Sequence, residues 1–177
     1  MKRLIATIGL FVCVLALVAG ASAQENLTFA DLPSVSTPSP MPSGYGQLNW
    51  SNFFYVNPWQ YAGAGSGFKG GPQTQDVVFI GTKTCRLVGY TCYGTLSSSK
   101  GFQLVSARAA AGSRSTCVLV NAYNNGKFVG ATPYCLNTGV QTLWFPDWGI
   151  VTEVVIQITG AADEVVLYDL SAYTLGQ

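Results

Sequence analysis

The chain has 177 residues, of which 10% are charged, and it contains nine basic residues, eight acidic residues and no histidine. This balance excludes a strongly basic nucleic-acid-binding surface. The missing histidine removes the usual general base, the Ser-His-Asp and Cys-His arrangements, and most zinc and copper sites. A surface with so few charges has to be built from Ser, Thr, Asn, Gln, Gly and Tyr. Such surfaces suit contact with sugars or cell walls, and they are also common in small secreted β proteins.

The beginning of the chain predicts a secretory signal peptide. Residues 1–3 are a short basic start, residues 4–20 are apolar apart from one threonine, and residues 21–23 form a small-residue cleavage motif. The alternative is a membrane anchor, but the apolar run is short for a spanning helix and the cleavage motif follows it directly. We expect cleavage after Ala23 and a secreted, extracellular protein that is free of the membrane.

We divide the chain into a signal peptide at 1–23, an N-terminal segment with a Pro/Ser-rich strap at 24–44, and a β-sandwich domain at 45–177. Residues 33–44 hold four of the eight prolines, so this strap cannot be helical and is expected to lie extended on the surface. The Gly-rich residues 62–73 formally match the dinucleotide motif G-x-G-x-x-G. Because no helix pattern follows this match, we predict a loop.

Seven short segments have the β-branched and aromatic composition of strands, and turn signals separate them. They span residues 76–81, 102–109, 116–123, 127–136, 141–145, 151–158 and 164–173. No segment after the signal peptide keeps a helical period over three turns. This pattern predicts a single all-β domain, an antiparallel β-sandwich or barrel.

Period-2 alternation predicts which side chains of two segments share a face. In 102–109, it groups Phe102, Leu104 and Ser106 against Gln103, Val105 and Ala107. In 151–158, it groups Val154, Ile156 and Ile158 on one face.

Four of the five cysteines follow the predicted signal peptide, which favours two disulfides in an oxidising compartment. The Asn-Asn-Gly sequence at 124–126 is a hairpin-turn signal. With a loop of three or five residues centred on Gly126, Cys117 faces Cys135 across the hairpin, and the second bond is then Cys85–Cys92. We expect both bonds to be structural, because the C-x-x-C spacing of redox pairs is missing.

Two N-glycosylation sequons are present, at Asn26 and at Asn49. Asn26 is the favoured acceptor because it lies at the beginning of the mature chain. Asn49 lies inside the aromatic segment 43–61, where packing can make its side chain inaccessible.

Carboxylates are the remaining candidates for catalysis or metal binding. A pair of them could hydrolyse glycosides, but no spacing singles out a pair. Asp169 has two orientations to consider. If it faces inward, it needs a partner, and calcium with Asp31 as second ligand is one. If Tyr168 faces inward instead, Asp169 is solvated, and we favour this arrangement because inward charges are rare.

The tryptophans either fill the core or form a stacking platform for sugar rings. We predict that Trp50 and Trp144 lie in the core. Exposure is expected for Trp59, Tyr61 and Trp148, which are the candidate ligand-binding residues. At least one side chain of the consecutive aromatic residues 53–55 has to lie outward or at a sheet edge.

Several segments resemble a group of uncharacterised, mostly fungal secreted proteins. Residues 28–57, TFADLPSVSTPSPMPSGYGQLNWSNFFYVN, are similar to a signature T-F-D-D-L, a Pro/Ser spacer and P-x-G-Y-x-x-L-N-W-x-N-F. FQLVSARAAA, VLVNAYNNGKFVG and YDLSAY resemble the family's later strands.

The resemblance implies a jelly-roll-like β-sandwich similar to carbohydrate-binding modules, in which the first and last strands often hold a structural calcium. Here Ala30 and Tyr168 replace the usual aspartates, and Asp31 and Asp169 remain. The four cysteines depart from the family's pattern. The resemblance implies a fold and a compartment, but no activity.

We therefore predict a secreted, non-catalytic β-sandwich that binds a glycan or cell-wall component and needs no cofactor. One alternative is a secreted interaction, effector or structural wall protein without a sugar pocket. The other is a small carboxylate-based, glycoside-active enzyme. The sequence does not indicate an oligomeric state.

Overall fold

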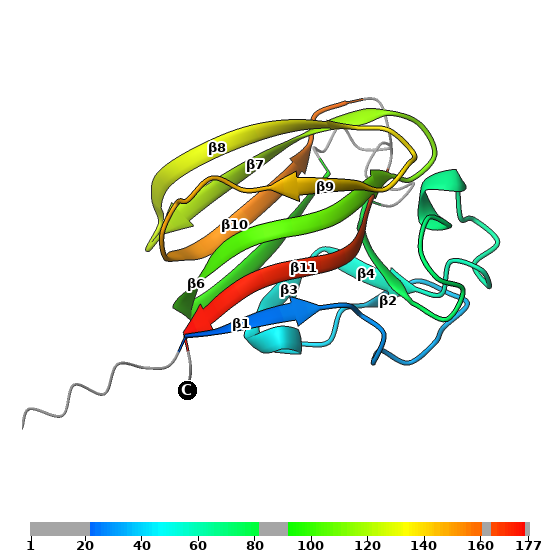
Figure 1. The fold of residues 1–177 in the computed structure, drawn as a ribbon, viewed down its shortest axis with the longest axis horizontal. Coiled ribbons are helices and arrows are strands. Elements are labelled where there is room, and N and C mark those ends of the chain that lie inside the picture. The colour runs from blue at the N-terminus through cyan, green and yellow to red at the C-terminus, as the bar shows by residue number, and fades with distance from the viewer. Residues whose placement is uncertain (1–21, 82–91, 161–163, 176–177) are drawn as a thin grey trace, which may run out of the picture.

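The computed structural model describes residues 22–81, 92–160 and 164–175 (Figure 1). In this part of the chain there is no α-helix, and all strand pairs are antiparallel. The strands are β1 (Ser22–Leu27), β2 (Ser39–Pro40), β3 (Asn49–Ser51), β4 (Phe53–Val56), β5 (Val77–Ile80), β6 (Tyr93–Ala111), β7 (Thr116–Asn124), β8 (Lys127–Leu136), β9 (Gln141–Trp144), β10 (Val151–Ile158) and β11 (Val165–Leu175). Two 3-10 turns, η1 (Tyr45–Gln47) and η2 (Ser66–Phe68), lie in the connections.

The long strand β6 belongs to both layers of a sandwich-like fold. Its first half pairs with β3 and β10, and β10 continues the first layer through β7 to the edge strand β8. Its second half pairs with β9 on one side and β11 on the other, and β11 continues the second layer through β1 and β5. Gly101 lies between the two halves with φ of 85°, a conformation that glycine adopts without strain.

The main core lies between the two layers. Val154, Ile156 and Ile158 of β10 are all buried in it, which confirms that they share one face and shows that this face points inward. A second cluster lies on the opposite face of β4, β5 and β11. It consists of Val56, Phe68, Val77, Phe79, Ala110, Val166 and Tyr168. The connection between β4 and β5 covers this cluster, because Phe68 of η2 packs edge-on against Phe79. One end of the outer face of the second layer is therefore buried.

A pair of β-bulges disturbs the alternation in the second layer. Val105 of β6 has no partner on β11, since Leu104 pairs with Ala172 and Ser106 with Ser171. Tyr168 of β11 is likewise unmatched between Leu167 and Asp169. The predicted grouping of Ser106 with Leu104 is wrong for this reason: each bulge reverses which side chains face inward.

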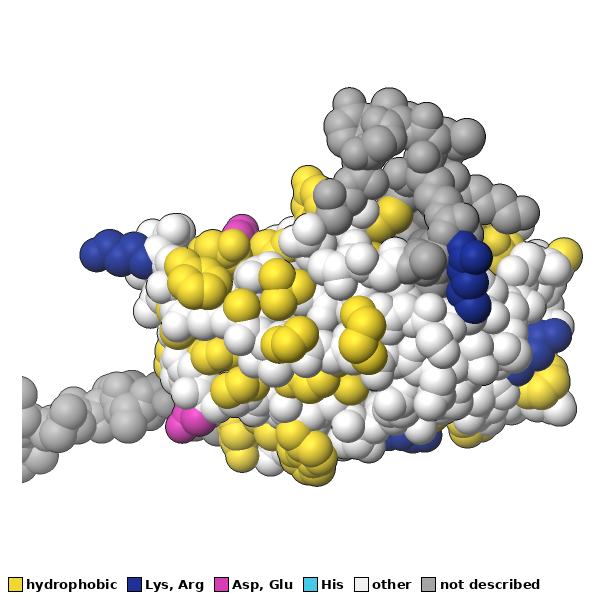
Figure 2. Space-filling model, turned by 90° about the horizontal axis from the view of Figure 1, so that it is seen from above, with side chains coloured by type: hydrophobic (Ala, Val, Ile, Leu, Met, Phe, Trp, Pro, Cys, Tyr) yellow, Lys and Arg dark blue, Asp and Glu magenta, His cyan; other side chains and the backbone are white. Residues whose placement is uncertain are grey.

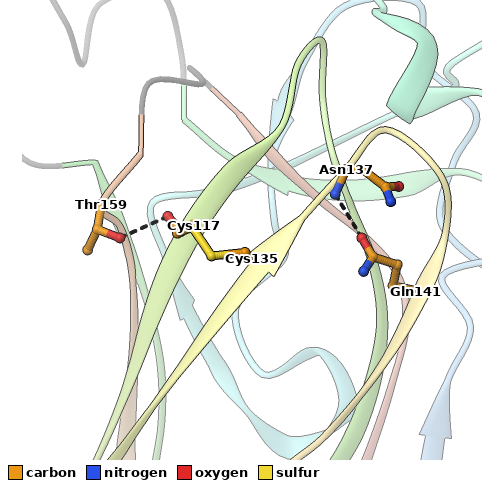
Figure 3. The surroundings of a disulfide bond; sticks show 5 residues. All are labelled: Cys117, Cys135, Asn137, Gln141 and Thr159. Carbon is orange, nitrogen blue, oxygen red and sulfur yellow. Dashed lines mark hydrogen bonds between the residues drawn. A yellow bond between two sulfur atoms is a disulfide. The ribbon is translucent and has the colours of Figure 1, made fainter.

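The β7–β8 hairpin confirms the predicted Cys117–Cys135 disulfide (Figure 3). Its loop is shorter than the sequence suggested, with Asn125 and Gly126 at φ of 49° and 75°. Such a two-residue turn alone would shift the register by one residue. The bulge at Val129 restores it, because Ala122 pairs with Gly130 while Tyr123 pairs with Phe128.

Three further predictions concern the second disulfide, the N-terminal segment and the membrane. The predicted Cys85–Cys92 bond involves Cys85, which lies outside the described residues. The segment 24–44 is part of the sheet as well as a connecting strap, since it contributes most of β1 and all of β2. None of the described residues forms a helix long and apolar enough to cross a membrane.

The Gly-rich loop has a packing role. A Cβ at Gly67 would overlap the carbonyl oxygen of Ala111, and one at Gly65 would overlap that of Gly112. The Gly67 N–H donates to the Gly112 carbonyl at 2.9 Å. These glycines allow the loop backbone to approach the end of β6, which explains the motif without a nucleotide.

We expect Gly67→Ala to lower the free energy of unfolding by about 1–3 kcal/mol, because the added methyl group would clash with backbone atoms. Chemical denaturation measures this change. Gly139→Ala is the matched control, since its Cβ would meet just the Asn137 side-chain oxygen at 3.1 Å. Equal stability of the two variants would contradict the packing role.

Candidate functional site

The exposed end of the second layer presents a face that we call the polar face. Its residues come from β1, β6, β9 and β11, which lie side by side at the front of Figure 1. The cross-strand register groups their side chains, since directly paired residues point to the same side of a sheet. The polar face consists of Gln24, Asn26, Gln103, Ser106, Arg108, Thr142, Trp144, Asp169, Ser171 and Tyr173.

Trp144 is the dominant side chain of this face, because 69% of its surface is exposed. Trp144 pairs with Ser106 on β6. The preceding residue, Leu143, pairs with Ala107 and points to the other side, into the core. The bulge at Val105 produces this arrangement. Its carbonyl accepts a hydrogen bond from the Phe145 N–H at 3.0 Å, which holds the end of β9 in place.

Hydrogen bonds fix several polar side chains around Trp144. Asp169 accepts from the Arg108 backbone N–H at 3.2 Å and from its guanidinium at 3.1 Å. Gln24 donates to the Ser171 hydroxyl at 3.1 Å, and the Tyr173 hydroxyl donates to Gln24 at 3.1 Å. Side chains held in this way keep their orientation for a ligand and lose little entropy when it binds.

The sequence prediction missed Trp144 as a site residue and placed it wrongly in the core. Strict alternation in residues 141–145 would have found it, since Leu143 and Phe145 share one face and Thr142 and Trp144 share the other. The predicted core position of Trp50 is confirmed: it is 9% exposed and donates its indole N–H to the Tyr45 carbonyl at 2.8 Å.

The three predicted ligand-binding residues do not form one surface. Trp59 and Tyr61 lie in the connection between β4 and β5, while Trp148 lies in the connection from β9 to β10, at the other end of the molecule (Figure 1). Trp59 is 44% exposed, with the Lys69 ammonium 5.8 Å from its ring centre. Tyr61 is partly buried against Phe68.

Trp148 is also partly buried and belongs to a row of aromatic side chains at the edge between the layers. Its ring centre is 6.1 Å from that of Phe145, which packs edge-on against Tyr134. A Cβ at Gly130 would lie 2.7 Å from the Trp148 indole nitrogen, so the glycine makes room for the ring. These contacts give Trp148 a structural role in closing the sandwich.

A second exposed face, which we call the apolar face, lies on the outer side of the first layer. Cross-strand pairs place Tyr93, Leu119, Tyr123, Phe128, Pro133 and Val155 on it, with the polar residues Thr95, Asn121, Glu153 and Gln157 between them. Phe128 is 62% exposed and Tyr93 47% exposed. Figure 2 shows hydrophobic side chains gathered on the side that carries β7 and β8, with most charged side chains near its margins.

The two predicted calcium ligands have separate partners. Asp31 accepts a hydrogen bond from the Tyr45 hydroxyl at 2.6 Å, and burial together with this bond raises the pKa of Tyr45 above its ordinary value. Asp169 faces away from the main core and pairs with Arg108, as favoured, but Tyr168 does not face the main core: it is fully buried in the second cluster, on the outer side of the layer, because of the bulge beside it. Among the described residues, no three acidic or cysteine side chains group to hold a metal.

An amide links the beginning and the end of the domain, where the resemblance implied an ion. The Gln75 side chain donates to the Thr28 carbonyl at 2.6 Å and to the Tyr168 carbonyl at 2.7 Å. Thr28 follows β1, and Tyr168 lies in β11. The Gln75 amide therefore occupies the position in which a cation could otherwise bind these two carbonyls.

Asp76 is the carboxylate with the most unusual surroundings. It is 2% exposed, and neither of its oxygens has a hydrogen-bond partner. Burial disfavours the charged form and raises the pKa of Asp76 to about 6. Asp76 lies beneath the surface next to β5, so it is a buried acid and not a group that a substrate could reach.

No protein-family model and no curated protein matches the chain. The fold is similar to a DUF4465 family protein from Bacteroides caccae ATCC 43185, with a TM-score of 0.54 and 11% identity over 90% of this chain and 96% of that chain. The K2 cleaved adhesin domain of Lys-gingipain gives a TM-score of 0.48 and 13% identity over 87% and 99% of the two chains. A family 32 CBM from C. perfringens NanJ, solved in complex with galactose, gives 0.43 and 18% over 72% and 93%.

The similarity to the DUF4465 protein shows a shared fold and does not extend to function at this identity. It agrees with the predicted all-β, sandwich-like class of protein. The function has to be inferred from the surface of this chain.

We expect stability to depend on pH through Asp76. The pKa of Asp76 is higher in the folded protein than in the unfolded chain. Its stabilising contribution to the free energy of unfolding is therefore fully present below about pH 4 and is lost as the pH rises through about 6. The full difference corresponds to about 3 kcal/mol. Chemical denaturation between pH 3.5 and 8 gives the free energy of unfolding of the wild type and of Asp76→Asn, and we expect the difference between the two to change with pH. A difference that stays constant over this range would contradict the account.

We also expect a chelator to leave the melting temperature nearly unchanged, because Gln75 already satisfies the two carbonyls between the first and last strands. Thermal unfolding with EDTA, and with calcium added back, measures this. A drop of many degrees that calcium reverses would show that Asp31 or Asp169 binds an ion in the folded protein.

Proposed function

We propose that this protein binds a glycan or cell-wall polysaccharide on its polar face, without catalysing a reaction. The observation that carries the proposal is the exposure of Trp144 on a sheet face that is otherwise built from hydroxyl, amide and paired charged side chains. Covering the exposed apolar area of an indole ring with a ligand is favourable, and its flat ring fits the C–H face of a pyranose.

The neighbours of Trp144 supply the polar half of sugar recognition. Sugars present hydroxyl groups around an apolar ring, so a binding site needs donors and acceptors beside an aromatic platform. Thr142 and Ser106 offer hydroxyls, and the Arg108–Asp169 pair offers a donor and an acceptor held in fixed positions. These groups lie side by side on neighbouring strands, which suits contact with an extended polymer chain.

The hydrogen bonds of one carboxylate on the polar face and of one beside it support the non-catalytic part of the proposal. Asp169 is paired with Arg108, and Asp147 accepts hydrogen bonds from the Gln103 side chain at 3.0 Å and the Gly149 N–H at 3.0 Å. Both carboxylates are engaged by hydrogen-bond donors of this chain. We propose that they position other side chains.

The proposal includes secretion, a jelly-roll relationship of the strands and the second disulfide, Cys85–Cys92. The Cys117–Cys135 bond supports the compartment, because disulfides persist where the surroundings are oxidising. The scarcity of charge supports a protein that works outside the cell against neutral polymers.

The second candidate function is a protein–protein contact through the apolar face. Its exposed aromatic residues, Phe128 and Tyr93, are the kind that interfaces use, and contiguous apolar patches on monomers commonly mark interaction sites. This candidate corresponds to an interaction or structural protein without a sugar site. The apolar face lies on the first layer and the polar face on the second, so substitutions on one face test one candidate function without altering the other face.

We expect Trp144→Ala to weaken binding to the responsive polysaccharide by about fivefold to 150-fold, since stacking on an aromatic ring contributes about 1–3 kcal/mol per ring by alanine substitution in nucleic-acid systems. Pull-down against cellulose, xylan, β-glucan and chitin identifies the polymer, and calorimetry with its oligosaccharide measures affinity. Trp59→Ala is the matched control, as it removes an exposed tryptophan elsewhere.

Wild-type levels of binding in Trp144→Ala would contradict the polar face as the site. Loss of binding in Trp59→Ala or Trp148→Ala instead would return the site to the residues first predicted from the sequence. If no polysaccharide binds, and Phe128→Ser abolishes capture of a defined protein partner, the second candidate function is supported.

A further inference from the structure

The sequon residue Asn26 lies in the same cross-strand row as Trp144. Asn26 pairs with Ser171 on β11, Ser171 pairs with Ser106 on β6, and Ser106 pairs with Trp144 on β9. Directly paired residues point to the same side, so Asn26 and Trp144 both project from the polar face. Three strand spacings separate them, which is about 14 Å.

Asn26 is available for modification. Its side chain is exposed, and within the described part of the chain no hydrogen bond engages it. The sequence Asn26-Leu27-Thr28 is an acceptor for N-linked glycans. The transfer forms a bond between the Asn26 amide nitrogen and C1 of the first sugar. The amide loses a proton, and the lipid diphosphate of the oligosaccharide donor leaves.

Short side chains separate Asn26 from Trp144 in this row. The two residues between them in the row are serines, of which Ser171 is buried and accepts a hydrogen bond from the Gln24 side chain at 3.1 Å, so a glycan on Asn26 passes beside Gln24. Each pyranose unit in a glycan is about as long as the spacing between neighbouring strands. The first few sugars of a glycan on Asn26 therefore span the row and bring an apolar sugar face to the exposed indole ring.

We propose that an N-linked glycan on Asn26 lies across the polar face and stacks on Trp144, so that the protein carries an internal competitor for its own binding face. This inference rests on the proposed function for its regulatory meaning, because the attached glycan and an external polysaccharide use the same indole ring. The glycosylated protein binds external polysaccharide more weakly than the unglycosylated protein does.

The second sequon supplies a matched control. Asn49 is exposed as well, but it pairs with Ser97 of β6 in the first layer, away from Trp144. A glycan on Asn49 has no row of small residues leading to the polar face. Variants Asn26→Gln and Asn49→Gln remove one sequon each and alter exposed side chains, so both are expected to fold.

The test compares wild type, Asn26→Gln and Asn49→Gln made in a glycosylating eukaryotic host. Peptide mass mapping gives the occupancy of each sequon. N-bromosuccinimide oxidation, followed by mass mapping, gives the reaction rates of Trp144 and Trp59. We expect an occupied Asn26, a Trp144 rate several-fold lower in wild type and Asn49→Gln than in Asn26→Gln, and a Trp59 rate that is equal in all three.

An unoccupied Asn26, or an occupied Asn26 with equal Trp144 rates in all three proteins, overturns the inference. Polysaccharide binding by Asn26→Gln is measured separately and tests the proposed function. If Asn26→Gln binds no polysaccharide while Trp144 is protected in wild type, the proposed function fails and the glycan contact stands.

Discussion

The bulge at Val105 is the constraint on which both the packing and the surface of the second layer depend. It inserts one unmatched residue into β6, so that Leu104 and Ala107 both face the core although they are three residues apart. Ser106 consequently faces outward, and its partner on β9, Trp144, faces outward with it. The Val105 carbonyl then accepts from Phe145, so the bulge also anchors the segment that carries the tryptophan.

The bulge at Tyr168 on β11 compensates for the one at Val105, and the two together define the polar face. Beyond Tyr168, the outer side of the layer is buried under η2, where the Tyr168 hydroxyl accepts from the Gly70 N–H at 2.9 Å and donates to the Gly67 carbonyl. Between the two bulges, the Arg108 and Asp169 side chains reach solvent, while Ser171 on the same side is buried and accepts a hydrogen bond from Gln24. The same face thus serves as core at one end and as a candidate binding surface at the other.

The sequence predicted the features that depend on local pattern. Alternation grouped Ile156 and Ile158 on one face, and the Asn-Asn-Gly turn paired Cys117 with Cys135. The pairing was correct although the loop length was not, because the turn and the bulge at Val129 shift the register in opposite directions. Strands with regular side-chain periods and glycine turns leave a strong signature, since backbone geometry alone determines them.

The candidate site was less accessible to sequence reasoning because it depends on irregularities and long-range pairing. A bulge inserts one residue without a clear compositional mark, so Ser106 was grouped with the wrong neighbours. Trp144 was assigned to the core by its size, although the alternation of Leu143 and Phe145 around it already indicated the opposite face. Asn26 and Trp144 are far apart in the chain, and nothing local indicates that three strand pairings bring them into one row.

The central claim is that a sugar ligand binds between Trp144 and the outward residues of β6 and β11. The most direct measurement is an NMR titration of the isotope-labelled, unglycosylated protein with the oligosaccharide of the polymer that it binds. The account predicts that the Trp144 indole N–H and the backbone amides of Ser106 and Ser171 shift most. Shifts confined to Trp59 and Lys69, or to Tyr93 and Phe128 on the apolar face, would contradict it.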